Sequence, residues 1–189
     1  ATFIYRTTNG GTSWTQVYTD ATSGAFIDAI HMFNATNGVA YGDPVTLPAP
    51  AKWVLIYTSN GGASWTRDTT NAPLQVGGEA GTQNGLCAVG STHIWFNSGV
   101  GGRIYKTTNG GSVWTSGVAP FPATSNVWFN STQYGVATGS AASGVARSTD
   151  GGATWTRVTV AGTGFLIACG GSGNDDFCYA RGTTIYRST

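Results

Sequence analysis

Two aspartates, Asp28 and Asp43, are the weak candidates for catalysis in this sequence. Glycoside hydrolysis needs two carboxyl groups about 5 to 10 Å apart, one as acid and one as base or nucleophile. Asp28 precedes a β-rich run and Asp43 ends the next one, so both could approach one exposed face of a sheet. The alternative is structural, because Gly42-Asp43-Pro44 is typical of a turn and Asp28 could bond nearby backbone.

Other site chemistry has little support in the residue types present. His31 and His93 are the only histidines, and no Cys/His spacing matches a structural zinc site. No glycine-rich loop leads from a strand into a helix, and no Asp-rich calcium loop occurs. We therefore expect neither a metal nor a cofactor.

Cys169 and Cys178 flank a stretch that is typical of a hairpin loop between two strands. This placement makes them near cross-strand neighbours, close enough for a disulfide if the register permits it. An exported location would favour the bridge, whereas the odd total of 3 cysteines does not. The other possibility is that they are small buried apolar residues.

These residues must be positioned by a repeated element. An eight-residue pattern occurs four times: Ser or Thr, any residue, Asn or Asp, Gly, Gly, two further residues and Trp. Its copies span residues 7–14, 58–65, 107–114 and 148–155, and a truncated fifth copy begins at 188–189. The Asn/Asp positions are 9, 60, 109 and 150, so the spacings are 51, 49 and 41 residues. Four-stranded propeller blades repeat at about 40 to 50 residues.

Each copy predicts a hairpin turn that is stabilised by its own residues. Asn-Gly or Asp-Gly between β-rich runs favours a tight turn, and the side chains can hydrogen-bond its backbone. We expect this structural role for Asn9, Asn60, Asn109 and Asp150. The tryptophan that opens the following strand should be largely buried at each copy: Trp14, Trp65, Trp114 and Trp155.

The pattern also predicts the strands. The strand before each turn should span 3–7, 54–58, 103–107 and 144–148, and two further β-rich runs lie between successive turns. No segment has a sustained helical period, so we expect an all-β chain. A basic residue stands three places before the Asn/Asp position in most copies, as Arg6, Lys106 and Arg147 do. It either contacts the adjacent blade or contributes to a basic perimeter that suits an anionic polymer.

The four copies resemble the Asp-box, or bacterial neuraminidase (BNR) repeat, of sialidases, glucan-cleaving propellers and photosystem II stability-factor-like propellers. The resemblance covers the whole chain and implies a β-propeller of four-stranded antiparallel blades, in which the box joins the third and fourth strands. The stretch 33–44 resembles exported propellers of Bacteroidota, many of which carry a type IX secretion sorting domain; none is visible here. The family implies an extracellular or surface-attached bacterial protein without a defined reaction.

The strand count predicts about four blades in a single propeller segment over residues 1–189. The chain begins and ends at a third strand, which favours a portion of a larger propeller, for example a seven-bladed one. A complete four-bladed ring with an overlapping terminal strand is the alternative, at the low end of the usual range of about four to eight blades.

Composition agrees with an exported all-β protein. Charged residues make up 9% of the chain and the net charge is +1. A basic stripe that could neutralise phosphates is missing, so we expect no nucleic-acid partner. No apolar run approaches the roughly 20 residues of a membrane span.

The connection from Asp43 to Trp53 is the longest of its kind and contains three prolines. Long ordered loops on a rigid scaffold often carry function, so Trp53 and Lys52 are the ligand-binding candidates. The alternative is that Trp53 opens a strand and is buried.

These observations favour a non-enzymatic exported or cell-surface propeller that acts as a scaffold or as a protein- or glycan-binding module. Attachment to the surface would use regions outside this chain. The alternative is a polysaccharide-cleaving glycoside hydrolase that uses Asp28 and Asp43.

Overall fold

The computed structural model describes residues 1–46, 49–139, 144–159, 166–172, 176–181 and 184–187. In the last three ranges it describes the backbone and, of the side chains, only Ile185 and Arg187. The described residues form 17 β-strands and no helix.

The strands form five antiparallel sheets, which we number as blades 1 to 5 in chain order. Blade 1 contains β1 (Thr2–Arg6) and β2 (Thr15–Asp20). Blade 2 contains β3 (Ile27–Met32), β4 (Gly38–Val45), β5 (Lys52–Thr58) and β6 (Thr66–Arg67). Blade 3 contains β7 (Leu86–Val89), β8 (His93–Asn97), β9 (Arg103–Thr107) and β10 (Thr115–Val118).

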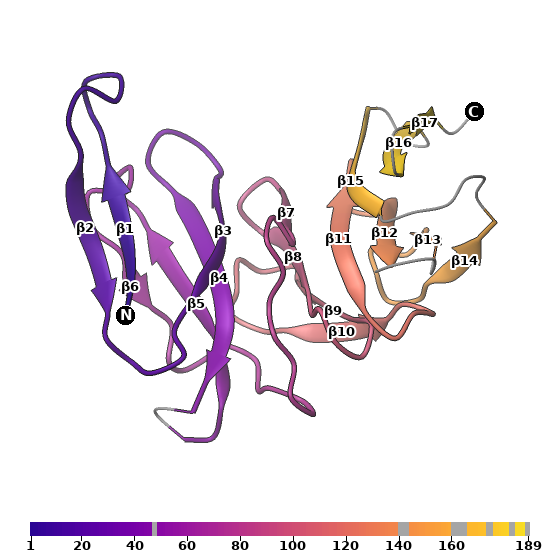
Figure 1. Ribbon diagram of the computed structural model, residues 1–189, viewed down its shortest axis with the longest axis horizontal. Coiled ribbons are helices and arrows are strands. Elements are labelled where there is room, and N and C mark those ends of the chain that lie inside the picture. The colour runs from indigo at the N-terminus through magenta and orange to yellow at the C-terminus, as the bar shows by residue number, and fades with distance from the viewer. Residues whose placement is uncertain (47–48, 140–143, 160–165, 173–175, 182–183, 188–189) are drawn as a thin grey trace.

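Blade 4 contains β11 (Thr124–Phe129), β12 (Gly135–Gly139), β13 (Val145–Ser148) and β14 (Thr156–Val158). Blade 5 contains β15 (Leu166–Ser172), β16 (Asp176–Arg181) and β17 (Thr184–Arg187). Blades 1 to 4 follow one another along the long axis of the molecule, from indigo to orange, and the strands of blade 5, orange to yellow, lie beside blade 4 (Figure 1).

Each blade is a meander in which consecutive strands pair. The repeat turns 58–65, 107–114 and 148–155 connect the third and fourth strands of blades 2 to 4, as predicted, and the turn 7–14 connects the two strands of blade 1. In each of them both glycines have positive φ, from 68° to 99°, a conformation that disfavours any residue with a Cβ. The glycine pair therefore fixes the turn, and the turn fixes which strands become neighbours.

The hydrophobic core is divided among the junctions between blades. One cluster joins Ile4 of blade 1 to Val54 and Ile56 of blade 2, and a second joins Leu55 of blade 2 to Phe96 of blade 3. A third joins blades 3 and 4. Alternate residues of β5 thus enter different clusters, as the two-residue period of a strand requires. Blades 2 and 3 therefore each contribute to two clusters, one on either face.

Candidate functional site

The strand ends give the blades two functional faces. The repeat-turn face carries the four repeat turns together with the β3–β4 and β7–β8 turns. The opposite end, which we call the strand-start face, carries the segments 21–26, 49–51, 68–85 and 98–102. These segments lead into the first strand of a blade or link its second and third strands.

On the repeat-turn face, the Asn/Asp side chain is bonded to its own turn. Asn60 Oδ1 accepts from Thr58 Oγ1 at 3.0 Å and from Ser64 N at 3.0 Å, while Gly62 N donates to Thr58 Oγ1 at 2.9 Å. Equivalent bonds occur at Asn9, Asn109 and Asp150. Burial acts to raise the pKa of Asp150, but hydrogen bonds from Thr154 and Ser148 outweigh it and lower the pKa to about 2. The same side chain is therefore an acceptor in all four turns.

The repeat turns also bind neighbouring segments. The first glycine N–H of three turns donates to the strand 1–2 turn of its own blade: Gly61 to Thr36 O, Gly110 to Thr92 O and Gly151 to Gln133 O, at 2.7, 3.0 and 2.8 Å. The residue three places before the Asn/Asp contacts the turn of the following blade. A Cβ on Gly61 would lie 3.6 Å from Arg6 Nη2, and one on Gly151 would lie 3.7 Å from Lys106 Nζ. The basic position thus contacts the adjacent blade at these two junctions.

The four repeat tryptophans are not equally buried, which corrects one prediction. Trp155 is 9% exposed, Trp65 and Trp114 are partly buried, and Trp14 is 60% exposed. Trp65, Trp114 and Trp155 each pack in the hydrophobic cluster that their blade shares with the preceding blade. No blade packs on the corresponding face of blade 1 in the structure, so Trp14, Phe3 and Tyr5 are exposed there.

Trp53 is fully buried, so the prediction that it offers an exposed stacking surface is wrong. Its ring centroid lies 4.9 Å from that of Phe96 and 5.5 Å from that of Tyr105. Lys52 Nζ donates to the carbonyl oxygens of Thr69 and Thr70, both at 2.8 Å. Both residues start β5, where antiparallel pairing with β4 turns Trp53 into the core between blades 2 and 3. Trp53 therefore offers no surface to a ligand, whereas the role of Lys52 as a ligand-binding residue stays a prediction.

Cys169 and Cys178 lie in the paired strands β15 and β16 of blade 5. The register pairs Cys169 with Tyr179 and Cys178 with Gly170, which sets the two cysteines one place out of line. Their side chains lie outside the described residues, so the disulfide stays a prediction.

Asp28 and Asp43 are brought together on the strand-start face. Asp28 lies at a bulge in β3 and Asp43 lies in β4, where its N–H donates to Phe26 O at 3.1 Å. Gly81 N donates to Asp43 Oδ1 at 2.6 Å, and a Cβ on Gly81 would collide with Asp28 Oδ2. The two carboxyl groups therefore contact the same glycine of the segment 68–85.

The environment of the two carboxyl groups differs. Asp28 Oδ2 is buried and has no hydrogen-bond partner within the described part of the chain. Burial, and secondly the negative charge of Asp43, raise the pKa of Asp28 to about 7. A carboxylic acid with this pKa can donate a proton near neutral pH. Both carboxyl groups thus lie against Gly81.

A second acidic group on this face was not predicted from the sequence. Glu79 is 5% exposed, and Arg103 Nε donates to its Oε1 at 2.9 Å. Tyr105 Oη and Val76 N donate to its Oε2 at 2.5 and 3.1 Å. Glu79 is the only glutamate of the sequence, and this was the only sequence feature that could have marked it as a site residue. It ties the segment 68–85 to β9.

Tyr41 anchors the same segment from blade 2. Tyr41 Oη donates to Thr82 O at 2.6 Å and accepts from Thr82 N at 2.9 Å. Gly99 N donates to Ala80 O at 2.8 Å, which links the segment to the β8–β9 connection. The strand-start face at blades 2 and 3 is thus a continuous hydrogen-bonded frame.

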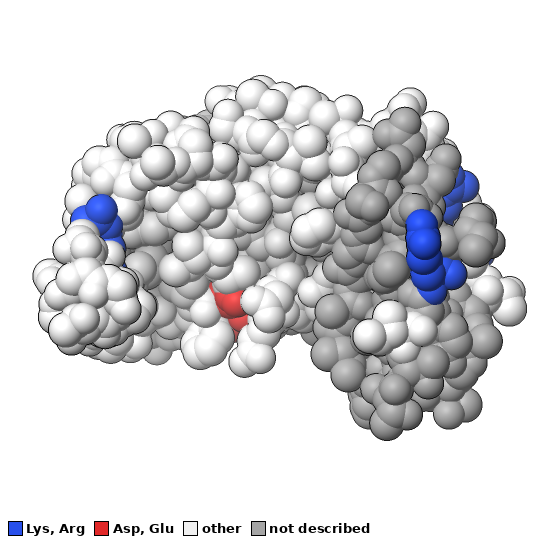
Figure 2. All heavy atoms as spheres, turned by 90° about the horizontal axis from the view of Figure 1, so that it is seen from above, with Lys and Arg blue, Asp and Glu red and all other residues white. Residues whose placement is uncertain are grey.

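Four large apolar side chains stand half exposed on this frame: Phe26, Leu74, Val76 and Val100, at 51%, 50%, 48% and 46%. Charged groups are scarce on the molecular face shown in Figure 2, where basic groups lie toward the ends and an acidic patch near the middle. No cluster of three or more His, Cys, Asp or Glu that could hold a metal occurs in the described ranges. Among the same residues, no helix is long and apolar enough to cross a bilayer.

Comparison with known proteins identifies the fold. No protein-family model matches the sequence, and no curated protein matches it. The structure of YCF48 bound to D1 peptide superposes with a TM-score of 0.60 at 16% identity, over 85% of this chain and 51% of that one. The fold is a β-propeller. YCF48 from Cyanidioschyzon merolae gives 0.63 at 17% identity, over 97% of this chain and 62% of that one.

Propeller enzymes share the fold. The GH74 xyloglucanase from Xanthomonas campestris gives a TM-score of 0.57 at 13% identity, over 82% of this chain and 27% of that chain. The chain therefore spans 51% to 62% of the YCF48 structures and about a quarter of the xyloglucanase. Because the same architecture serves a peptide-bound protein and a glycosidase, the fold does not decide the function.

Proposed function

We propose that this chain is part of a non-enzymatic Asp-box propeller that acts as a scaffold or binding module and whose main partner is a segment of another protein. Export to the bacterial cell exterior or surface, with attachment through regions outside this chain, belongs to the same proposal. It is motivated by the 9% content of charged residues and by the resemblance of the four repeat turns to exported propellers. A glycan is the second class of partner in this proposal.

The main evidence for a protein partner is the group of exposed apolar side chains on the strand-start face. Phe26, Leu74, Val76 and Val100 are each about half exposed, although the core beneath them is fully packed. Exposed apolar side chains that gather on one face favour association with another protein. The structural likeness to YCF48 bound to D1 peptide supports a propeller that binds a peptide.

The frame beneath these side chains supports the same conclusion. Asp43, Tyr41 and Tyr105 hold the segment 68–85 through bonds of 2.5 to 2.9 Å to its backbone and to the side chain of Glu79. A surface that is already ordered loses little conformational entropy when a partner binds. Leu74 and Val76 would therefore contact a partner from a fixed position.

The hydrolase alternative is less well supported by the geometry. Asp28 has the raised pKa of a general acid, but its Oδ2 is buried and both carboxyl groups contact Gly81. A sugar ring and its leaving group need open space between an acid and a base. Incubation of the chain with xyloglucan, followed by a reducing-end assay, should release no product above that of Asp28→Asn.

The binding proposal is tested with selected peptides. Displayed random peptides are enriched on the wild-type chain, and the enriched sequences are synthesised and titrated. The double variant Leu74→Ser/Val76→Ser should weaken binding at least about tenfold, which corresponds to about 1.4 kcal/mol. Val113→Ser is the matched control, because Val113 is 61% exposed but lies on the repeat-turn face. Equal affinities for the double variant and the control would reject the strand-start face as the binding surface.

A further inference from the structure

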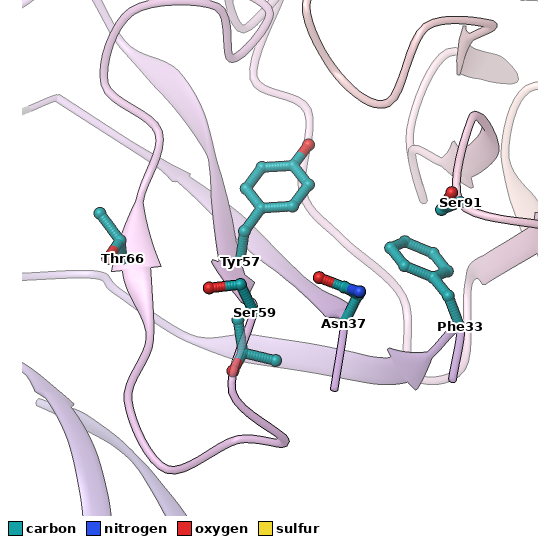
Figure 3. Close-up of a pocket in the computed structure, with 8 residues that line it drawn as sticks. Phe33, Asn37, Tyr57, Ser59, Thr66 and Ser91 are labelled. Atoms are coloured by element: carbon teal, nitrogen blue, oxygen red, sulfur yellow. The ribbon is translucent and has the colours of Figure 1, made fainter. Parts of the chain in front are cut away.

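A pocket of about 480 Å³ lies on the repeat-turn face, at the junction of blades 2 and 3. Its lining consists of Phe33, Asn37, Gly38, Tyr57, Thr58, Ser59, Thr66 and Ser91. All but Ser91 belong to blade 2, and Ser91 comes from the β7–β8 turn of blade 3. Figure 3 shows the labelled side chains around this opening. Pockets of about 300 to 1,000 Å³ accommodate small ligands.

The junction differs in chemistry from its equivalents. Tyr57 occupies the position that Arg6 and Lys106 occupy at the junctions of blades 1 and 2 and of blades 3 and 4. There the long cations reach the glycines of the next repeat turn. Here Tyr57 Oη packs against Gly111, where any Cβ would collide with it. At this junction a neutral ring therefore stands where the other two junctions have a cation.

The lining combines aromatic rings with neutral hydrogen-bonding groups. Phe33 and Tyr57 provide the rings, and no charged residue lines the pocket. Within the described part of the chain, the side-chain hydroxyls of Ser59, Thr66 and Ser91 have no protein hydrogen-bond partner, and all three residues are exposed. Hydroxyl groups can both donate and accept, as sugar hydroxyls do.

Tyr57 contributes its ring and not its hydroxyl to the pocket. Tyr57 Oη is buried against Gly111 and has no hydrogen-bond partner in the described residues. Burial, and secondly the charge of Asp68, raise the pKa of Tyr57, so the side chain is neutral.

We propose that this pocket binds one unit of a neutral saccharide, with a pyranose face against Phe33 or Tyr57 and its hydroxyls bonded to Ser59, Thr66 and Ser91. The proposal rests on the binding-module function and locates its glycan partner. An ionised sugar would lose its hydration without meeting an opposite charge, so the pocket disfavours anionic glycans. The site lies at the opposite end of the strands from the apolar group of Leu74 and Val76.

The test is a titration of the wild-type chain with cellohexaose, xylohexaose and mannohexaose, followed by ligand-observed NMR and calorimetry. Oligogalacturonate serves as the anionic probe. Tyr57→Phe keeps the ring and removes only the buried hydroxyl, so it should bind the sugar like the wild type. Ser91→Tyr should abolish binding by filling the pocket. Thr66→Ala should weaken binding, whereas its matched control Thr115→Ala, at the equivalent exposed position of blade 3, should not.

Three results would overturn the proposal: no neutral oligosaccharide binds, the oligogalacturonate binds more tightly, or Ser91→Tyr leaves sugar binding unchanged. An uncharged peptide that competes at this pocket would equally reject a saccharide site. Peptide binding at the strand-start face is measured in the same samples. If the chain binds peptide but no sugar, only the saccharide proposal is rejected. If it binds neither peptide nor sugar, the proposed function as a binding module is rejected as well.

Discussion

Asp28 and Asp43 both contact a single residue, Gly81: its N–H donates to Asp43 Oδ1 at 2.6 Å, and a Cβ on it would collide with Asp28 Oδ2. The pair that is the best candidate for catalysis therefore holds the connection between blades 2 and 3. Asp43 accepts a hydrogen bond, whereas Asp28 Oδ2 is buried without a partner in the described residues. We interpret the pair as a structural contact of the strand-start face.

The raised pKa of Asp28 predicts a dependence of stability on pH. Its pKa is 3.8 in the reference state and about 7 in the folded chain. The unfolded chain loses this proton first, so stability falls as pH rises from about 4 to 7. When the pH is raised from about 4.5 to 7.5, the free energy of unfolding of the wild type should fall by about 1 to 2 kcal/mol more than that of Asp28→Asn. This figure allows for screening of the partly exposed group by solvent. Urea unfolding of both proteins at the two pH values measures these free energies. If the difference in stability between the wild type and Asp28→Asn is the same at both pH values, this account of Asp28 is contradicted.

Gly81 should tolerate no side chain while Asp28 is present. Gly81→Ala places a methyl group on Asp28 Oδ2 and should destabilise the chain by about 1 to 3 kcal/mol, as overpacking does. Asp28→Ala removes the colliding oxygen, so the double variant should be more stable than the sum of the single effects predicts. A double-mutant cycle by thermal or urea unfolding tests this. Strictly additive effects would show that the two residues do not interact.

The repeat turns should depend on their Asn/Asp side chain. Asn60→Ala removes the acceptor of Ser64 N and Thr58 Oγ1 and should destabilise the chain by about 1 to 2 kcal/mol. Asn60→Asp keeps the acceptor and should be close to the wild type. Asn71→Ala, at an exposed position without a comparable side-chain bond, is the control. Unfolding midpoints of Asn60→Ala and Asn71→Ala that coincide would mean that the turn does not need its side-chain bonds.

The tryptophans of the first and fourth repeat turns should differ in importance. Trp155 is 9% exposed and packs with Phe129, so Trp155→Ala should cost about 3 to 5 kcal/mol. Trp14 is 60% exposed, and Trp14→Ala should cost less than about 1 kcal/mol. Denaturant unfolding of the two variants gives the comparison. The unequal burial is not supported if Trp14→Ala is as damaging as Trp155→Ala.

The strands were predictable because their signal is local. Asn60-Gly61-Gly62 specifies its own turn through positive φ and neighbouring bonds, and the strands on either side follow from it. Burial of Trp14 and Trp53 depends on distant blades, which no local pattern contains. Trp14 lacks a blade to cover it in the structure, whereas Trp53 meets Phe96, 43 residues away (96 − 53).

The candidate site was predicted less well than the fold for the same reason. Asp28 and Asp43 were recognised as a pair, but Gly81 between them comes from the connection that follows blade 2. Glu79 was missed because Arg103 and Tyr105, which bond it, lie in the next blade. Leu74 and Val76 are apolar residues in a connecting segment, and the sequence does not indicate that they remain exposed.

Hydrogen–deuterium exchange of the intact chain, with and without a selected peptide at saturation, tests the proposed binding surface most directly. Slower exchange is predicted in the segments 68–85 and 98–102, which carry Leu74, Val76 and Val100, because a partner on the strand-start face excludes solvent there. The repeat turns 58–65 and 107–114 should exchange at unchanged rates. Protection confined to the repeat turns, with no change in 68–85 or 98–102, would contradict the account.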